Sequence, residues 1–186
     1  MRKVAHHAAL PYLALPAFMK ELREQTSFTA RALEYLILTA TRTNETLCAN
    51  WDEIDADRAL WTIPAQRMKA SKDHRVPLSP RTLELVEEMA QFRINEFLFP
   101  GAKPGRPLSQ MSMLMLLRRM GYGHITTHGF RSSFRDWAAE CTTFPGEVAE
   151  LALAHAVGNA VEAAYRRGDL LVQRQRLMQE WADFCD

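Results

Sequence analysis

The chain has 186 residues, 47% of them hydrophobic and 24% charged, a balance typical of a globular domain long enough to bury a substantial core. Its formal net charge is +1, so binding to nucleic acid would depend on a local basic surface and not on an overall excess. Three scattered cysteines without a CxxC pair argue against a disulfide framework or a zinc site, and the lack of a membrane-length apolar run or a leader argues against membrane insertion and secretion.

Two helices and a hairpin are expected in the first half of the chain. Residues 16–25 open on a proline and carry apolar side chains at helical spacing, and residues 27–41 repeat this pattern behind a serine or threonine cap. The period then changes to that of β-strands over residues 59–64 and 73–79, which a polar, basic segment joins. We therefore expect a hairpin with a long tip, preceded by a short strand near residues 51–54.

Everything after residue 79 is expected to be helical. The first of these helices has a serine at its cap and a proline at its first position, where the missing N–H costs nothing. The expected helical segments are 79–92, 108–122 (capped near Ser109), 127–141, 145–155, 159–168 and 169–185, the last with an apolar stripe that packs on its own domain. The pattern predicts a single α+β domain over residues 1–186, mostly α-helical with one small antiparallel sheet.

Two short motifs place cations near helix ends. Arg42 follows an apolar helix, with Glu45 three residues later. His128 and Arg131 lie three residues apart at the start of another helix and so share a face, where a helix N-terminus with these side chains can cradle a phosphate. Each motif alone also fits an ordinary surface, as a weak helix-end ion pair or a solvated helix face.

The hairpin tip is strongly basic. Its cations are Arg67, Lys69, Lys72, His74 and Arg75. Such a tip is either a solvated surface or a segment that reaches a phosphate backbone.

A final motif runs from His155 to Tyr165, which two arginines follow directly. A tyrosine in an alanine-rich helix is usually part of the core, with its hydroxyl hydrogen-bonded. Only partners elsewhere in the chain favour another role for it.

Taken in order, these motifs resemble the tyrosine recombinases, specifically the catalytic domain of temperate-phage and genomic-island integrases. The resemblance covers almost the whole chain and is carried by the phrases WTIPAQRMK, VPLS, HGFRSSFRDWA and LAHAVGNAVEAAYRRGDL. Two positions depart from it, because Ala40 stands where many relatives have glycine and Ala154 stands in the usual Leu-Gly-His.

The resemblance implies a role for each site residue. The implied catalytic residues are Arg42, Lys69, His128, Arg131, His155 and the nucleophile Tyr165, with Glu45 supporting the first arginine. Lys69 matches the hairpin lysine that acts as general acid, with Lys72 as the fallback. The remaining hairpin cations, Arg67, Lys72 and Arg75, are expected to contact DNA.

The chemistry of a phosphodiester suits these residue types. A phenol with a pKa of about 10 is a poor nucleophile at neutral pH unless it is helped. Two guanidiniums stabilise the charge of the pentavalent transition state, and arginine suits this task better than lysine because its planar fork grips two oxygens. His128 can assist deprotonation of the tyrosine, while His155 would hydrogen-bond the phosphate.

The implied function is integration or excision of a prophage or genomic island through a 3′-phosphotyrosyl intermediate. One ester is exchanged for another, so we expect no cofactor and no metal. We expect double-stranded DNA as the partner, a tetramer on DNA and a monomer when free, in the bacterial cytoplasm at the nucleoid. The upstream core- and arm-binding domains of the family are expected to be absent. The alternatives are a catalytically inactive DNA-binding relic, a helical interaction module and a topoisomerase-like enzyme.

Overall fold

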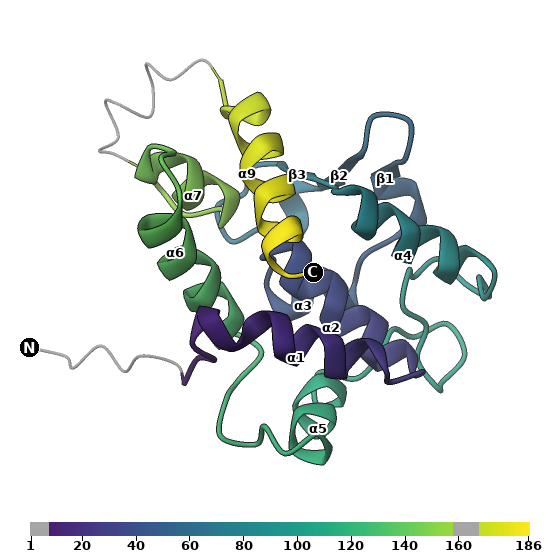
Figure 1. Ribbon diagram of the computed structural model, residues 1–186. Helices are drawn as coiled ribbons and strands as arrows, with labels where there is room; N and C mark the ends of the chain where they lie inside the picture. The colour runs from purple at the N-terminus through teal and green to yellow at the C-terminus, as the bar shows by residue number, and fades with distance from the viewer. Residues whose placement is uncertain (1–7, 158–167) are drawn as a thin grey trace, which may run out of the picture.

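The computed structural model, which describes residues 8–157 and 168–186, consists mostly of helices, with one small sheet toward the upper edge of the molecule in the view of Figure 1. The α-helices are α1 (Leu15–Arg23), α2 (Phe28–Thr39), α3 (Thr43–Leu47), α4 (Pro80–Ala90), α5 (Ser112–Arg119), α6 (Gly129–Cys141), α7 (Gly146–Ala152) and α9 (Leu171–Phe184). Strands β1 (Ile54–Asp55), β2 (Leu60–Ile63) and β3 (His74–Pro77) pair antiparallel in chain order, with Trp61 opposite Val76. The predicted class, α+β and mostly helical, is confirmed.

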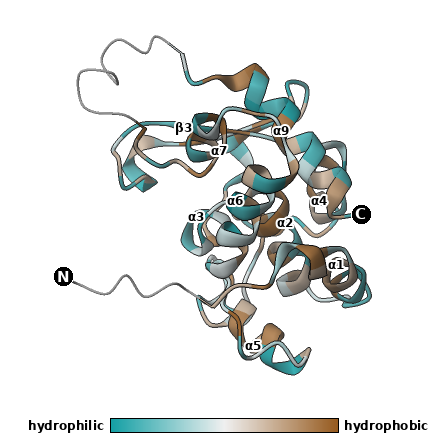
Figure 2. Cartoon of the chain, turned by 60° about the vertical axis from the view of Figure 1, so that its left-hand side comes forward, coloured by the Kyte–Doolittle hydropathy of each residue, from teal (hydrophilic) through white to brown (hydrophobic). Residues whose placement is uncertain are grey.

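Helix α2 forms the centre of the core. Ser27 caps its N-terminus by accepting a hydrogen bond from the Ala30 N–H at 3.2 Å. Every residue from 32 to 40 is buried, as expected of a helix that other elements cover on all sides. Helices α1, α4, α5 and α9 pack against it, and Figure 2 shows its brown, apolar ribbon in the middle of the molecule.

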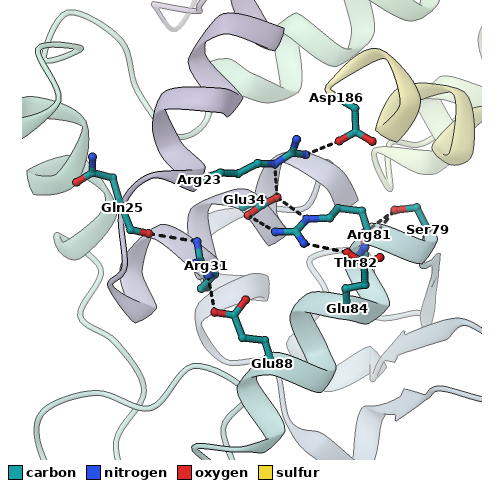
Figure 3. Close-up of polar contacts among 10 residues, drawn as sticks. All are labelled: Arg23, Gln25, Arg31, Glu34, Ser79, Arg81, Thr82, Glu84, Glu88 and Asp186. Carbon is teal, nitrogen blue, oxygen red and sulfur yellow. Dashed lines mark hydrogen bonds and ion pairs between the residues drawn. The ribbon is translucent and has the colours of Figure 1, made fainter.

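A buried carboxylate ties three helices together (Figure 3). Glu34 of α2 is fully buried and accepts hydrogen bonds from Arg23 Nε of α1 at 2.8 Å and from Arg81 Nε of α4 at 2.9 Å. Arg23 also pairs with Asp186 at 2.7 Å. Because removing one partner of a buried ion pair leaves a charge uncompensated, this cluster makes the relative placement of α1, α2 and α4 specific.

Aromatic side chains join α6 to α9. The ring of Trp181 lies 5.2 Å from Phe134 and 4.9 Å from Trp137, and its indole N–H donates to the Ile37 carbonyl at 2.8 Å. Helix α9 therefore packs on its own domain, as its apolar stripe predicts. The stripe also contains Arg174, which is only 1% exposed and which the sequence pattern had placed among the polar side chains.

The N-terminal segment, residues 8–10, lies across the start of α6. The Ala8 carbonyl accepts a hydrogen bond from the Thr126 N–H at 3.0 Å, and the Leu10 carbonyl accepts one from the Ser133 hydroxyl. A Cβ on Gly129 would collide with the backbone of Ala8. The first residue of α6 is thus a glycine because another stretch of backbone passes directly over it.

The prediction that everything after residue 79 is helical is wrong for residues 91–111. This segment has two isolated bridges, Asn50 with Phe97 and Pro100 with Pro107, and helix α5 begins at Ser112 and not near Ser109. Three prolines and two glycines in the segment remove N–H donors and weaken the helical preference.

Two smaller expectations have different outcomes. The strand expected near residues 51–54 is a 3₁₀ turn followed by the two-residue β1. The helix expected at 159–168 falls almost entirely on residues 158–167, which lie outside the described residues. No helix in the described ranges is long and apolar enough to cross a membrane.

Candidate active site

The guanidinium of Arg131, in the first turn of α6, is enclosed by backbone carbonyls. Nη1 donates to the Ala40 carbonyl at 2.5 Å and Nη2 to the Leu153 carbonyl at 2.6 Å, and the residue is 4% exposed. Burial, together with the nearby positive charge of Arg42, lowers the pKa of Arg131 to about 10. Two like charges therefore lie close together, and the one on Arg131 is shielded from water, an arrangement that a bound anion would stabilise.

Arg42 is the residue that precedes α3, and Glu45 holds it there. The Arg42 N–H donates to Glu45 Oε2 at 2.9 Å and its Nη1 donates to Oε1 at 2.7 Å. Nη2 reaches the Ala154 carbonyl at 3.5 Å. Glu45 is buried, whereas 28% of the Arg42 side chain stays exposed, so the guanidinium is fixed from behind and open on one side.

Two alanines with left-handed backbone aim these carbonyls. Ala40 (φ 51°) ends α2, and Ala154 (φ 50°) follows α7. The Ala40 carbonyl accepts from Arg131 and the Ala154 carbonyl accepts from Arg42, so each turn supports one guanidinium. Residues other than glycine rarely adopt this backbone conformation, which explains why the resemblance leads one to expect glycine at both positions.

His155 lies beside the arginines. Its Nε2 is 3.2 Å from Arg131 Nη2, and its Nδ1 is 2.7 Å from Glu150 Oε2. The imidazole is 41% exposed. The structure thus brings together Arg42, Arg131 and His155, three of the six residues that the sequence selects.

His128 directly precedes α6 and is exposed at its N-terminus, three residues from Arg131. The hydroxyls of Thr43 and Thr127 form a hydrogen bond of 2.9 Å, which holds the start of α3 against the start of α6. Since Arg42 directly precedes Thr43 and His128 directly follows Thr127, His128 belongs to the same region as the arginines.

The lysines of the hairpin tip are less constrained. Lys69 and Lys72 are exposed in the connection between β2 and β3, and neither forms a hydrogen bond or ion pair within the described part of the chain. The structure does not bring Lys69 into contact with the arginines, so its role as general acid stays a prediction.

The two hairpin arginines expected to contact DNA have protein partners. Arg67 pairs with Glu53 and donates to the Glu45 carbonyl at 2.6 Å. Arg75 donates through Nε and Nη2 to the two carboxylate oxygens of Asp169, at 3.0 and 2.6 Å. Contact of Arg67 and Arg75 with DNA is untested, and each side chain already has a role within the protein.

Tyr165 lies outside the described residues, but the chain is anchored four residues later. Asp169 pairs with Arg75 and also with the buried Arg174, whose Nη2 is 2.5 Å from Asp169 Oδ2. Arg174 Nη1 donates to the Arg75 carbonyl at 2.6 Å, which fixes the start of α9 to β3. One feature of the sequence could have revealed this cluster: Arg174 lies three residues before Leu177 and seven before Trp181, at a spacing that puts it on the buried face of α9.

His74 is not part of the exposed cationic tip, contrary to the sequence reasoning that grouped it there. His74 lies in β3, is only 9% exposed and forms a hydrogen bond with the backbone of Ala152. Burial, reinforced by the charge of Arg174, lowers the pKa of His74 to about 4. The histidine is therefore neutral at ordinary pH.

Comparison with known proteins decides the family. Residues 12–169 match the model of the phage integrase family. The chain belongs to that family. Prophage integrase IntA of Escherichia coli (strain K12) is 41% identical to this phage integrase family domain over 174 residues, which make up 91% of the chain and 42% of IntA. The chain therefore spans less than half the length of that relative.

Solved structures support the same fold. The integrase from mycobacterium phage Brujita superposes with a TM-score of 0.69 at 16% identity, over 97% of this chain and 59% of that one. A lambda integrase tetramer bound to a Holliday junction gives a TM-score of 0.60 at 17% identity, over 90% of this chain and 52% of that one. Among the residues that the structure describes, no group of three or more histidine, cysteine, aspartate or glutamate side chains is placed to hold a metal ion.

Proposed function

We propose that this phage integrase family domain cuts and rejoins DNA strands in site-specific recombination, through a covalent 3′-phosphotyrosyl link to Tyr165. The observation that carries the proposal is the pair of guanidiniums, Arg42 and Arg131. Backbone carbonyls and one carboxylate hold the two like charges near each other. A phosphodiester, with one negative charge shared by two non-bridging oxygens and a second that develops in the transition state, is the ligand that such a pair stabilises.

In this reaction the Tyr165 oxygen forms a bond to phosphorus, and the bond from phosphorus to the 5′ oxygen breaks. The phenol proton passes to His128, and Lys69 gives a proton to the leaving 5′ oxygen. Arg42 and Arg131 hold the non-bridging oxygens, and His155 hydrogen-bonds the phosphate. The phosphotyrosyl ester is close in energy to the phosphodiester it replaces, so the step reverses when another 5′ hydroxyl attacks.

The partner in this proposal is double-stranded DNA, bound by a protein that is monomeric when free and tetrameric on DNA. The tetramer of lambda integrase on a Holliday junction supports this assembly. Work on DNA implies a place in the bacterial cytoplasm, at the nucleoid.

The test is a covalent adduct on a nicked suicide duplex, in which the short 5′ fragment diffuses away after cleavage. At low salt the wild-type protein forms an adduct that survives a denaturing gel. Tyr165→Phe keeps the ring but lacks the nucleophilic oxygen, so it forms none while binding DNA as before. Arg131→Ala loses the adduct as well, and cleavage falls by at least about 10²-fold.

Three results separate the alternatives. An adduct with Tyr165→Phe would make another residue the nucleophile. DNA binding without any adduct from the wild type would favour an inactive DNA-binding relic. Unfolding of the Tyr165→Phe protein, seen by circular dichroism, would favour a structural tyrosine in a helical interaction module.

A further inference from the structure

Glu150 of α7, which the sequence reasoning did not select, lies beside His155. Its Oε2 is 2.7 Å from Nδ1 of the imidazole, and its Oε1 accepts a hydrogen bond from Arg135 Nε of α6 at 2.6 Å. The other ring nitrogen of His155 is 3.2 Å from Arg131 Nη2. Both nitrogens of the imidazole are therefore held, one by an anion and one by a cation.

The partners determine where the ring carries its proton. A guanidinium can only donate hydrogen bonds, so Nε2 of His155 accepts from Arg131. The proton of the neutral ring is then on Nδ1 and is donated to Glu150. In the DNA-free protein, Glu150 thus fixes both the tautomer of His155 and the direction in which Nε2 points.

We propose that Glu150 is a positioning residue for His155 in the cleavage reaction: it orients the ring toward the phosphate that Arg131 binds and stabilises the ring when it gains a second proton. This rests on the proposed function. A phosphate oxygen and the unprotonated Nε2 are both hydrogen-bond acceptors, so they can form a hydrogen bond only when Nε2 carries a proton. The ring therefore takes one proton from solvent when the phosphate binds, and returns it when the phosphate leaves.

The charges around His155 make the carboxylate necessary. Arg131 and Arg135 of α6 and Arg42, which precedes α3, all disfavour a cationic ring, whereas Glu45 and Glu150 favour it. Of these two carboxylates, Glu150 is the one that contacts the imidazole. Partial burial alone would raise the pKa of Glu150, but its hydrogen bonds with His155 and Arg135 outweigh this effect and hold the pKa below its ordinary value. The carboxylate is therefore charged over the whole range in which histidine titrates.

The first experiment follows the imidazole itself and needs no DNA. Nitrogen-15 spectra of the ring, with His155→Gln to assign its signals, should show the proton on Nδ1 in the wild type. The hydrogen bond to Glu150 should move the signal of the Nδ1 proton downfield and slow its exchange with solvent. In Glu150→Ala the downfield shift should disappear and the exchange should become rapid. A proton found on Nε2 in the wild type would overturn the proposal, whether or not the protein cleaves DNA.

The second experiment measures single-turnover cleavage of the nicked duplex from about pH 5 to pH 9 at saturating DNA. Glu150→Gln keeps the shape and an acceptor oxygen but removes the charge, so the alkaline fall in rate should begin about one pH unit lower, a tenfold loss on that side. Arg135→Gln is the matched control, because it breaks the same contact between α6 and α7 without touching His155. Since it removes a cation, its alkaline limb should stay in place or move to higher pH, the direction opposite to that of Glu150→Gln.

The outcomes distinguish a failure of the role of Glu150 from a failure of the proposed function. Equal rate losses in Glu150→Gln and Arg135→Gln, with no shift of the alkaline limb, would reduce Glu150 to a structural link between α6 and α7. If the wild type forms no adduct at all, the proposed function fails, and the spectra alone decide whether Glu150 orients the ring.

Discussion

Replacing Ala154 by glycine should stabilise the protein, the reverse of the usual effect of this substitution. Ala154 has φ 50°, in the left-handed region, where a residue with a Cβ costs about 1–2 kcal/mol relative to glycine. Two effects oppose this gain: glycine gives the unfolded chain more conformational freedom, which costs about 0.4–1 kcal/mol, and the substitution removes a partly buried methyl group. The balance is a gain of about 0.5 kcal/mol in the free energy of unfolding.

The matched control is Ala139→Gly, at an exposed position inside α6 with ordinary helical backbone. There glycine should lower the free energy of unfolding by about 1 kcal/mol, so the two variants should differ by about 1.5 kcal/mol. Urea unfolding measures both, compared at an unchanged slope of free energy against denaturant. If Ala154→Gly lowers the midpoint as much as Ala139→Gly does, residue 154 is not left-handed, and the account of how its carbonyl is aimed at Arg42 is wrong.

Two further predictions concern buried ionisable groups. The folded-state pKa of His74 is lowered from 6.5 to about 4, so protonation favours the unfolded chain: its contribution to stability is complete above pH 6.5 and falls by about 3 kcal/mol as the pH drops to 4. Stability measured against pH should therefore have a shallower acid slope in His74→Gln, and an unchanged slope would contradict this reasoning. Glu34→Gln should lower the free energy of unfolding, measured by thermal unfolding, by about 3–5 kcal/mol, because it leaves Arg23 and Arg81 without their buried partner. Glu84→Gln, at a carboxylate that is 62% exposed, should change it by less than about 0.5 kcal/mol. Similar losses in both variants would show that burial of Glu34 is not what matters.

Local signals in the sequence predicted the elements well. A serine before a proline predicted the cap of α4, and Ser79 indeed accepts a hydrogen bond from the Thr82 N–H at 3.3 Å. Apolar periodicity predicted α2 and the inward face of α9, since both patterns extend over three turns or more. The pattern did not predict the irregular segment 91–111, because prolines and glycines occur both at boundaries between successive helices and in stretches without helix.

The residues of the candidate site could likewise be predicted only in part. The motif His128–x–x–Arg131 and the order of the site residues were visible in the sequence, because they depend on spacing along the chain. Glu150 was not, since an acidic side chain five residues before a histidine looks like any solvated helix position until α6 is packed against α7. Arg174 and Glu34 were missed for a related reason, because the partners that allow a charge to be buried lie on other elements, up to 99 residues away in the case of Arg174 and the Arg75 carbonyl.

The passage of residues 8–10 over the start of α6 limits how far the protein can be shortened for laboratory use. Ala8 supplies an acceptor to Thr126, and its backbone fills the space where Gly129 has no side chain. A version that begins at Leu15 would keep every α-helix of the core. It would, however, leave Gly129 in the first turn of α6 open to water, one residue from His128 and two from Arg131. Expression fragments of this domain should therefore begin at or before Ala8, and a fluorescent label or affinity tag joined directly to Leu10 would perturb the site as much as a substitution within it.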